Sequence, residues 1–149
     1  MGLFDMLSIS ASALGAERQR AEVTAANLAN AETTHTDAGG PYVRKEVVFS
    51  ATSGSPFQTV FNNLGRFGQE PPGSVQLTQV VDDPTPPVQR YQPGNPDANA
   101  QGYVDYPAID PTTEMVDLMG AVRSYQLNAS AVSAAKQMIQ ESIDILKSS

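Results

Sequence analysis

Apolar residues recur in alternating steps of three and four along residues 115–146, over about five heptads. This spacing places one apolar row along a helix, which would span roughly 54 Å from Pro111 to Leu146 at 1.5 Å per residue. Helices in globular domains average about 11 or 12 residues, so this one is long. The row consists of Met115, Leu118, Val122, Tyr125, Ala129, Val132, Lys136 as its one polar interruption, Ile139, Ile143 and Leu146.

A second apolar row lies about 140° around the same helix. A helix that is apolar on two sides needs two packing partners. One partner can be an N-terminal helix of the same chain, and the other can belong to another molecule. This second row consists of Gly120, Ser124, Leu127, Ala131, Ala134, Met138 and Ile145, and Glu141 interrupts it.

The sequence also carries a start signal for this helix. Asp110 can accept amide hydrogens as the N-cap, and Pro111 follows at the first helical position, where its missing N–H costs nothing. Glu114 lies in the first turn, where the helix dipole favours negative charge. We therefore expect the helix to begin at Pro111.

The N-terminal segment shows the same heptad spacing with smaller residues. One polar residue interrupts this row, as one interrupts the C-terminal row, and two explanations are open for both. A charge within a packed row can fix the register of two helices, or its long side chain can reach out to water. The row consists of Phe4, Leu7, Ala11, Leu14, Arg18, Ala21, Ala25 and Leu28.

Residues 34–108 differ in composition from both ends. They hold ten of the eleven prolines and eight of the eleven glycines, which disfavours helix and favours turns. Three stretches, "YVRKEVVFSA", "SVQLTQVV" and "PVQRY", are typical of short strands, and residues 53–73 are typical of a loop. The predicted fold is mainly α with a small β region (α+β), with long terminal helices pairing as a coiled coil. The expected divisions are 1–33, 34–108 and 109–149.

Charge and composition exclude several classes of function. The net charge of −7 is spread along the chain without a basic patch, so nucleic acid and anionic membranes are not expected partners. No run approaches the roughly 18 apolar residues of a membrane span, so membrane insertion is not expected. The first basic residue is Arg18, which does not fit a secretory signal. We expect that, if the protein leaves the cytoplasm, it does so without a cleaved signal.

Few residues could support catalysis. The chain has no cysteine, and its single histidine, His35, lies in a loop-like stretch where an ordinary exposed side chain is expected. Asp82 and Asp83 could form a metal-binding or an acid pair, but a polar turn before Pro84 explains them better. No phosphate loop or metal-spaced cluster is present in the sequence. We expect no catalytic, cofactor or metal site and no small-molecule substrate.

Three stretches together resemble the bacterial flagellar axial proteins, the family of rod and hook subunits. "SALGAERQRAEVTAANLANAET" is similar to their N-terminal signature, and "YQPGNPDANAQGYVDYP" with "EMVDLMGAVRSYQLNASAVSAAKQMI" resembles a rod subunit of the basal body. The resemblance implies a structural subunit that transmits torque without catalysis. It also implies partners, namely copies of itself, other rod subunits and the flagellar type III export apparatus, and a location in the rod across the periplasm. Residues 51–73 match this family less well.

Two asparagines in the signature, Asn27 and Asn30, are poor residues for a helix interior. In one interpretation Asn30 caps the helix in a left-handed conformation and Asn27 is solvated. In the other, both offer uncharged hydrogen bonds to a neighbouring subunit, since a buried charge there would cost more.

The resemblance favours the second interpretation. We expect contacts between subunits at Leu14, Asn27, Leu28, Asn30, Val122, Tyr125, Leu127, Val132, Met138 and Ile139. The competing function class is an intracellular coiled-coil adaptor or chaperone, which would share the heptads without needing the signature.

Overall fold

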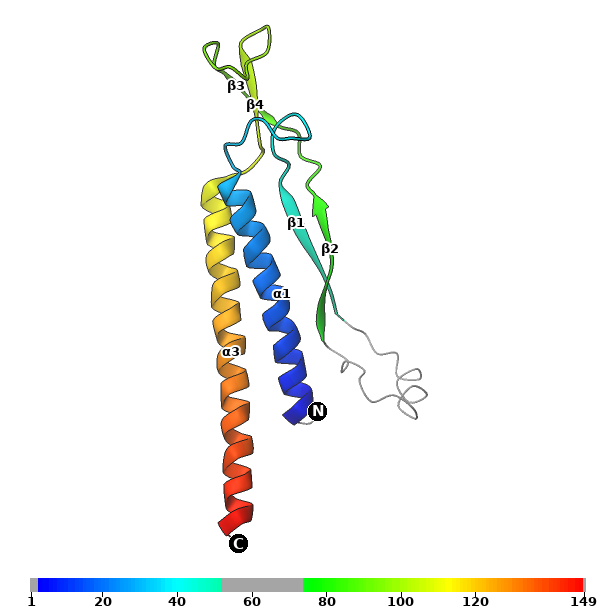
Figure 1. The fold of residues 1–149 in the computed structure, drawn as a ribbon, viewed down its shortest axis with the longest axis vertical. Coiled ribbons are helices and arrows are strands. Elements are labelled where there is room, and N and C mark those ends of the chain that lie inside the picture. The colour runs from blue at the N-terminus through cyan, green and yellow to red at the C-terminus, as the bar shows by residue number, and fades with distance from the viewer. Residues whose placement is uncertain (1–2, 52–73, 149) are drawn as a thin grey trace, which may run out of the picture. The chain divides into compact units, whose positions relative to one another are not determined.

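The computed structural model of the protein describes residues 3–51 and 74–148. Two long helices at the chain ends, α1 and α3, flank a small region of short antiparallel strands, which confirms the predicted mainly helical α+β class (Figure 1). In chain order the elements are α1 (Leu3–Ala29), β1 (Lys45–Ala51), β2 (Val75–Asp82), β3 (Val88–Tyr91), β4 (Tyr103–Tyr106) and α3 (Pro111–Ser148).

The chain divides into two compact units. The first lies within Met1–Gln19, Phe49–Thr78 and Ala121–Ser149, and the second comprises Arg20–Val48 and Gln79–Gly120. Each terminal helix contributes to both. In the first unit the backbone N–H of Val75 donates to Ser12 Oγ at 3.2 Å, which ties the start of β2 to α1. The second unit holds most of the long-range polar contacts described below.

The start of α3 follows the predicted cap. Asp110 Oδ1 accepts the backbone N–H of Thr112 at 3.0 Å, and Asp110 Oδ2 accepts the Thr113 hydroxyl at 3.0 Å. The Asp110 carbonyl accepts the first helical hydrogen bond, from Glu114 N at 3.1 Å. The helix begins at Pro111, as predicted from the sequence.

The cap also predicts a pH dependence. The hydrogen bonds from Thr112 and Thr113 hold the pKa of Asp110 below its ordinary value of 3.8. Because the folded pKa is the lower one, the carboxylate stabilises the fold fully above pH 3.8, and this stabilisation is lost as the pH falls through the folded pKa. We expect Asp110→Asn, which keeps a capping oxygen, to lower stability at neutral pH and to lose less stability on acidification. Urea unfolding at a series of pH values measures this, and parallel pH profiles for variant and parent would contradict it.

The packed side of α3 differs from the predicted row by about one position. The buried apolar residues are Ala121 and Ala135, whereas their predicted neighbours Val122 and Lys136 are exposed. Small residues allow closer helix packing, and an alanine row is hard to distinguish from a larger apolar row by hydropathy alone. The predicted row is therefore wrong in part, although its members Leu118, Val132 and Ile139 are half-buried.

A similar shift occurs in α1. The buried positions are Ala16, Thr24 and Asn27, whereas the predicted positions Ala11 and Ala25 are exposed. The two charged residues of the predicted rows, Arg18 and Lys136, are both exposed, which is what reaching out to water requires.

The central region contains two separate pairs of strands. β1 pairs with β2, and β3 pairs with β4 in antiparallel register from Val88↔Tyr106 to Tyr91↔Tyr103. Three strands were predicted, but the four-residue β4 was not, because its sequence "YVDY" is short and leads directly toward α3. The predicted loop at residues 53–73 lies outside the described residues. Of the helices that the structure describes, none has the length and apolarity needed to span a membrane.

Candidate functional site

Asn27 lies near the end of α1, and its side chain is only 1% exposed. Its Oδ1 accepts the backbone N–H of Lys45 at 3.0 Å and the hydroxyl of Tyr42 at 3.1 Å. Its Nδ2 donates to the carbonyl of Lys45 at 2.8 Å and to Glu114 Oε2 at 3.3 Å. An asparagine amide has two acceptor and two donor positions, so all four are used inside the chain.

The contact with Lys45 is bidentate. One side-chain amide bonds both the N–H and the C=O of the first residue of β1, as a neighbouring strand would. The end of α1 is thereby fixed to the start of β1. Because Lys45 uses backbone atoms in this contact, the asparagine, and not the identity of residue 45, supplies the specific chemistry.

Glu114 carries a buried negative charge beside Asn27. Its side chain is 3% exposed, and its Oε1 accepts a hydrogen bond from Arg44 Nε at 2.7 Å. Arg44 also donates to Asp83 at 3.3 Å and pairs with the exposed Glu46. Burial alone would lower the pKa of Arg44, but the hydrogen bonds to Glu114 and Glu46 outweigh it and raise that pKa. The guanidinium therefore stays charged and compensates the buried carboxylate.

Tyr42 completes this group. Burial raises the pKa of its hydroxyl, and the carboxylates of Asp82 and Glu114 raise it further. The hydroxyl thus keeps its proton and donates a hydrogen bond to Asn27 Oδ1. We call Asn27, Tyr42, Arg44 and Glu114 the polar cluster; together they join α1, the segment before β1 and the first turn of α3.

Two contacts in the second unit show how the terminal helices meet there. Asn27 bonds Glu114, and Arg20 lies 3.8 Å from Asp117. The earlier residue of α1 meets the later residue of α3, so in this unit the two helices run antiparallel. The helix pairing expected from the heptads is present at this end.

The asparagine signature differs in part from both sequence interpretations. Asn27 is buried and not solvated, and its own chain uses all four of its hydrogen-bonding positions. Asn30 instead donates to the carbonyl of Ala26 at 2.8 Å and accepts from Thr33 at 3.2 Å. Among the described residues only glycines have positive φ, so the left-handed cap at Asn30 is wrong.

Sequence reasoning missed Tyr42 and Arg44 and assigned Glu114 only to the helix dipole. Arg44 and Glu114 are 70 positions apart, and no local pattern relates them. The one available signal was the run of charged residues "RKE" inside the predicted strand "YVRKEVVFSA". The polar-turn interpretation of Asp83 is supported, since its carboxylate accepts bonds from the N–H and hydroxyl of Thr85, which lower the pKa of Asp83.

The cluster contains no arrangement that prepares a nucleophile or a proton transfer. His35 is exposed. No group of three or more histidine, cysteine, aspartate or glutamate side chains within residues 3–51 and 74–148 is placed to hold a metal ion. What the cluster can do is hold the three segments in one geometry.

The other residues predicted to contact neighbouring subunits lie on α1 and α3, and they differ in how exposed their side chains are. Val122, Tyr125, Leu127 and Met138 are exposed on α3. The remaining four are half-buried, and their role between subunits stays a prediction; they are Leu14, Leu28, Val132 and Ile139.

Two family models match the chain. A model described as "Flagella basal body rod protein" matches residues 7–34, and one described as "Flagellar basal body rod FlgEFG protein C-terminal" matches residues 100–145. These segments contain nearly all of both helices as well as β4. Asn27 and Glu114 lie inside the matches, whereas Tyr42 and Arg44 lie between them.

Curated relatives align along almost the full chain. The flagellar basal-body rod protein FlgC of Bacillus subtilis is 37% identical over 99% of this chain and 100% of its own length. FlgC of Yersinia enterocolitica is 38% identical over 97% and 98%, and FlgC of Borreliella burgdorferi is 29% identical over 99% of both. With this identity over full length, the chain belongs to the family of the flagellar basal-body rod protein FlgC.

Proposed function

We propose that the chain packs into the flagellar rod through the exposed apolar side chains of α3, while the polar cluster holds the geometry of its own helix pair. Membership of the FlgC family makes it a structural subunit of the flagellar basal body. Rod subunits assemble with copies of themselves and with other rod components. The intracellular adaptor or chaperone considered above finds no support in these relatives.

The exposed apolar residues of α3 carry this proposal. Burying one such side chain contributes about 1.5–3 kcal/mol, so burying several of them against neighbouring subunits strongly favours assembly. The chain's own buried apolar side chains, within its described part, are mostly alanines. These exposed residues, which are distributed around the helix, are Met115, Val116, Met119, Val122, Tyr125, Leu127, Met138, Ile143, Ile145 and Leu146.

The same proposal includes the export route of the subunit and its mechanical role. The subunit passes through the flagellar type III export apparatus without cleavage of a signal and takes its place in the rod across the periplasm. It transmits torque and catalyses no reaction. Leu14, Leu28, Val132 and Ile139 are proposed to contact neighbours at the margins of the helix pair, and Asn30 to do so from the end of α1.

A pair of matched variants tests the role of the exposed apolar side chains. Met138 is 47% exposed, and Gln137 beside it is also exposed but polar. In a strain lacking the native gene, we expect Met138→Asp to abolish swimming and rod assembly, because a charge would be buried against a neighbour. Gln137→Asp should support normal swimming. Equal swimming by the two variants would contradict the proposal, provided that immunoblots show equal amounts of both.

A further inference from the structure

The β3–β4 ribbon has two different faces. In the register Gln89↔Asp105 and Tyr91↔Tyr103, these four side chains share one face, because alternate residues of a strand point the same way. All four are exposed. On the opposite face Val104 is buried and the Arg90 guanidinium lies 4.5 Å from the centre of the Tyr106 ring. We call the exposed side, made of Gln89, Tyr91, Tyr103 and Asp105, the tyrosine face.

The rings of the tyrosine face are held in place although they are exposed. Tyr91 and Tyr103 meet edge to face with centroids 5.3 Å apart. Gly102, at φ +82°, lies beneath Tyr91, and a Cβ there would come within 3.0 Å of the ring. Yet Tyr91 remains 65% exposed. A fixed, exposed aromatic side chain loses little conformational freedom on binding, which is the property of an interface anchor.

The tyrosine face also has an uncompensated charge. Asp105 accepts a hydrogen bond from the neutral Gln89 amide at 3.0 Å. The one basic residue of the two strands, Arg90, is on the opposite face. A partner that suits this face therefore offers a cation together with apolar surface.

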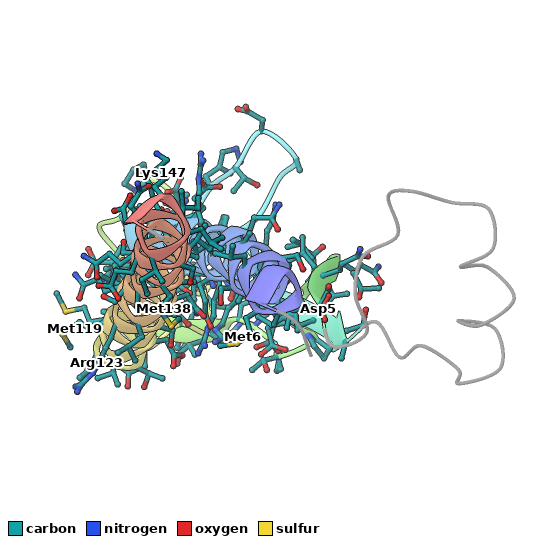
Figure 2. All side chains as sticks on the ribbon, turned by 90° about the horizontal axis from the view of Figure 1, so that it is seen from below. Asp5, Met6, Met119, Arg123, Met138 and Lys147 are labelled. Atoms are coloured by element: carbon teal, nitrogen blue, oxygen red, sulfur yellow. The ribbon has the colours of Figure 1, made fainter. Side chains whose placement is uncertain are left out.

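Such a surface is present on α3. Val116, Met119, Arg123 and Leu127 follow one another at helical spacing, and all four are exposed. Figure 2 shows Met119 and Arg123 projecting from the same side of the helix. Among the arginines in the described part of the chain, Arg123 is the one without a hydrogen bond, ion pair or ring contact. We call these four residues the arginine row.

We infer that the arginine row of one copy docks on the tyrosine face of the next copy. Arg123 can pair with the Asp105 carboxylate and lie over a tyrosine ring, while Met119 contacts the ring edges. Tyrosine, methionine and arginine are the residue types enriched in interface centres. The inference rests on the proposed assembly into the rod, and it adds which surfaces meet.

The geometry of this contact has a consequence for assembly. The two surfaces differ, so the contact is heterologous: each copy gives one surface and receives with the other. Repeated contacts of this kind build an open helical array when the rotation does not close into a ring. A rod is an array of that type.

Cross-linking tests the contact, because the chain has no native cysteine. Asp105→Cys and Arg123→Cys are produced in one cell as two separate chains, and purified basal bodies are treated with a short bismaleimide. We expect a dimer containing one chain of each variant, and none when either variant is present alone. The pair Asp37→Cys and Arg123→Cys serves as control, since Asp37 is an exposed acidic residue that is not part of the tyrosine face.

The outcomes separate this inference from the proposed function. If both cysteine variants are found in basal bodies but form no mixed dimer, the inference is overturned and the rod assignment stays intact. If the native chain is absent from basal bodies, both the inference and the rod assignment are overturned. If the cysteine variants fail to assemble, exchanging the two charges between positions 105 and 123 tests the contact instead. Asp105→Arg should stop swimming, and adding Arg123→Asp in the same chain should restore it. If the double variant does not restore swimming although the single and the double variant are both exported normally, the result would count against the contact.

Discussion

Replacing Asn27 with alanine is expected to lower the free energy of unfolding by about 3–5 kcal/mol, close to the highest values seen for single substitutions. Four hydrogen bonds are lost at a side chain that is 1% exposed. The N–H and C=O of Lys45 and the hydroxyl of Tyr42 then lack their partner. Each buried polar group left unsatisfied costs about 1–3 kcal/mol, and water entering the space recovers some of that.

The second asparagine of the signature provides a matched control. Asn30 bonds the carbonyl of Ala26, one turn back in its own helix, and Thr33 just beyond. Because these contacts are local and partly solvated, Asn30→Ala should cost under about 1 kcal/mol. Urea unfolding gives both values, and hydrogen exchange at the Lys45 amide gives a local measure. If the two substitutions had equal effects, or if exchange at Lys45 were unchanged in Asn27→Ala, the cluster would not hold β1 to α1.

Removing the arginine of the polar cluster is the second substitution with a large expected effect. Arg44→Ala leaves the buried Glu114 carboxylate with only the 3.3 Å bond from Asn27. Breaking a buried ion pair from one side costs about 3–5 kcal/mol, since the remaining charge is uncompensated. We therefore expect Arg44→Ala to be as destabilising as Asn27→Ala.

Two further variants test the cause of that loss. Glu46 also pairs with Arg44, but its side chain is 52% exposed, so Glu46→Ala should cost at most about 1 kcal/mol. The double variant Arg44→Met with Glu114→Leu removes both charges and should regain much of the stability lost in Arg44→Ala. Thermal and urea unfolding measure these values. A double variant as unstable as Arg44→Ala would show that packing of the arginine stem, and not the unpaired charge, is responsible.

Local signals predicted the elements of this fold well. The cap at Asp110 and Pro111 fixed the start of α3 because both residues act on their immediate neighbours. The strands β1, β2 and β3 were predicted from β-branched and aromatic runs between turn residues. The heptads predicted two long helices.

The features that local signals did not predict depend on contacts between residues that are far apart in the sequence. Asn27 and Glu114 are 87 positions apart, so neither residue alone indicates that both are buried. The asparagine stood out as unsuited to a helix interior, but its partner could not be read from the sequence. The rotation of the packed faces was also missed, because alanine at positions 121 and 135 packs more closely than the larger residues that define the apolar row.

The most direct test of the chain's role is mass spectrometry of purified flagellar basal bodies compared with cytosol from the same cells. A structural rod subunit should be enriched in the basal bodies in fixed proportion to the other rod proteins, and its N-terminal peptide should be uncleaved. Absence of the chain from intact rods, with recovery only in cytosol, would contradict its assignment as a rod subunit.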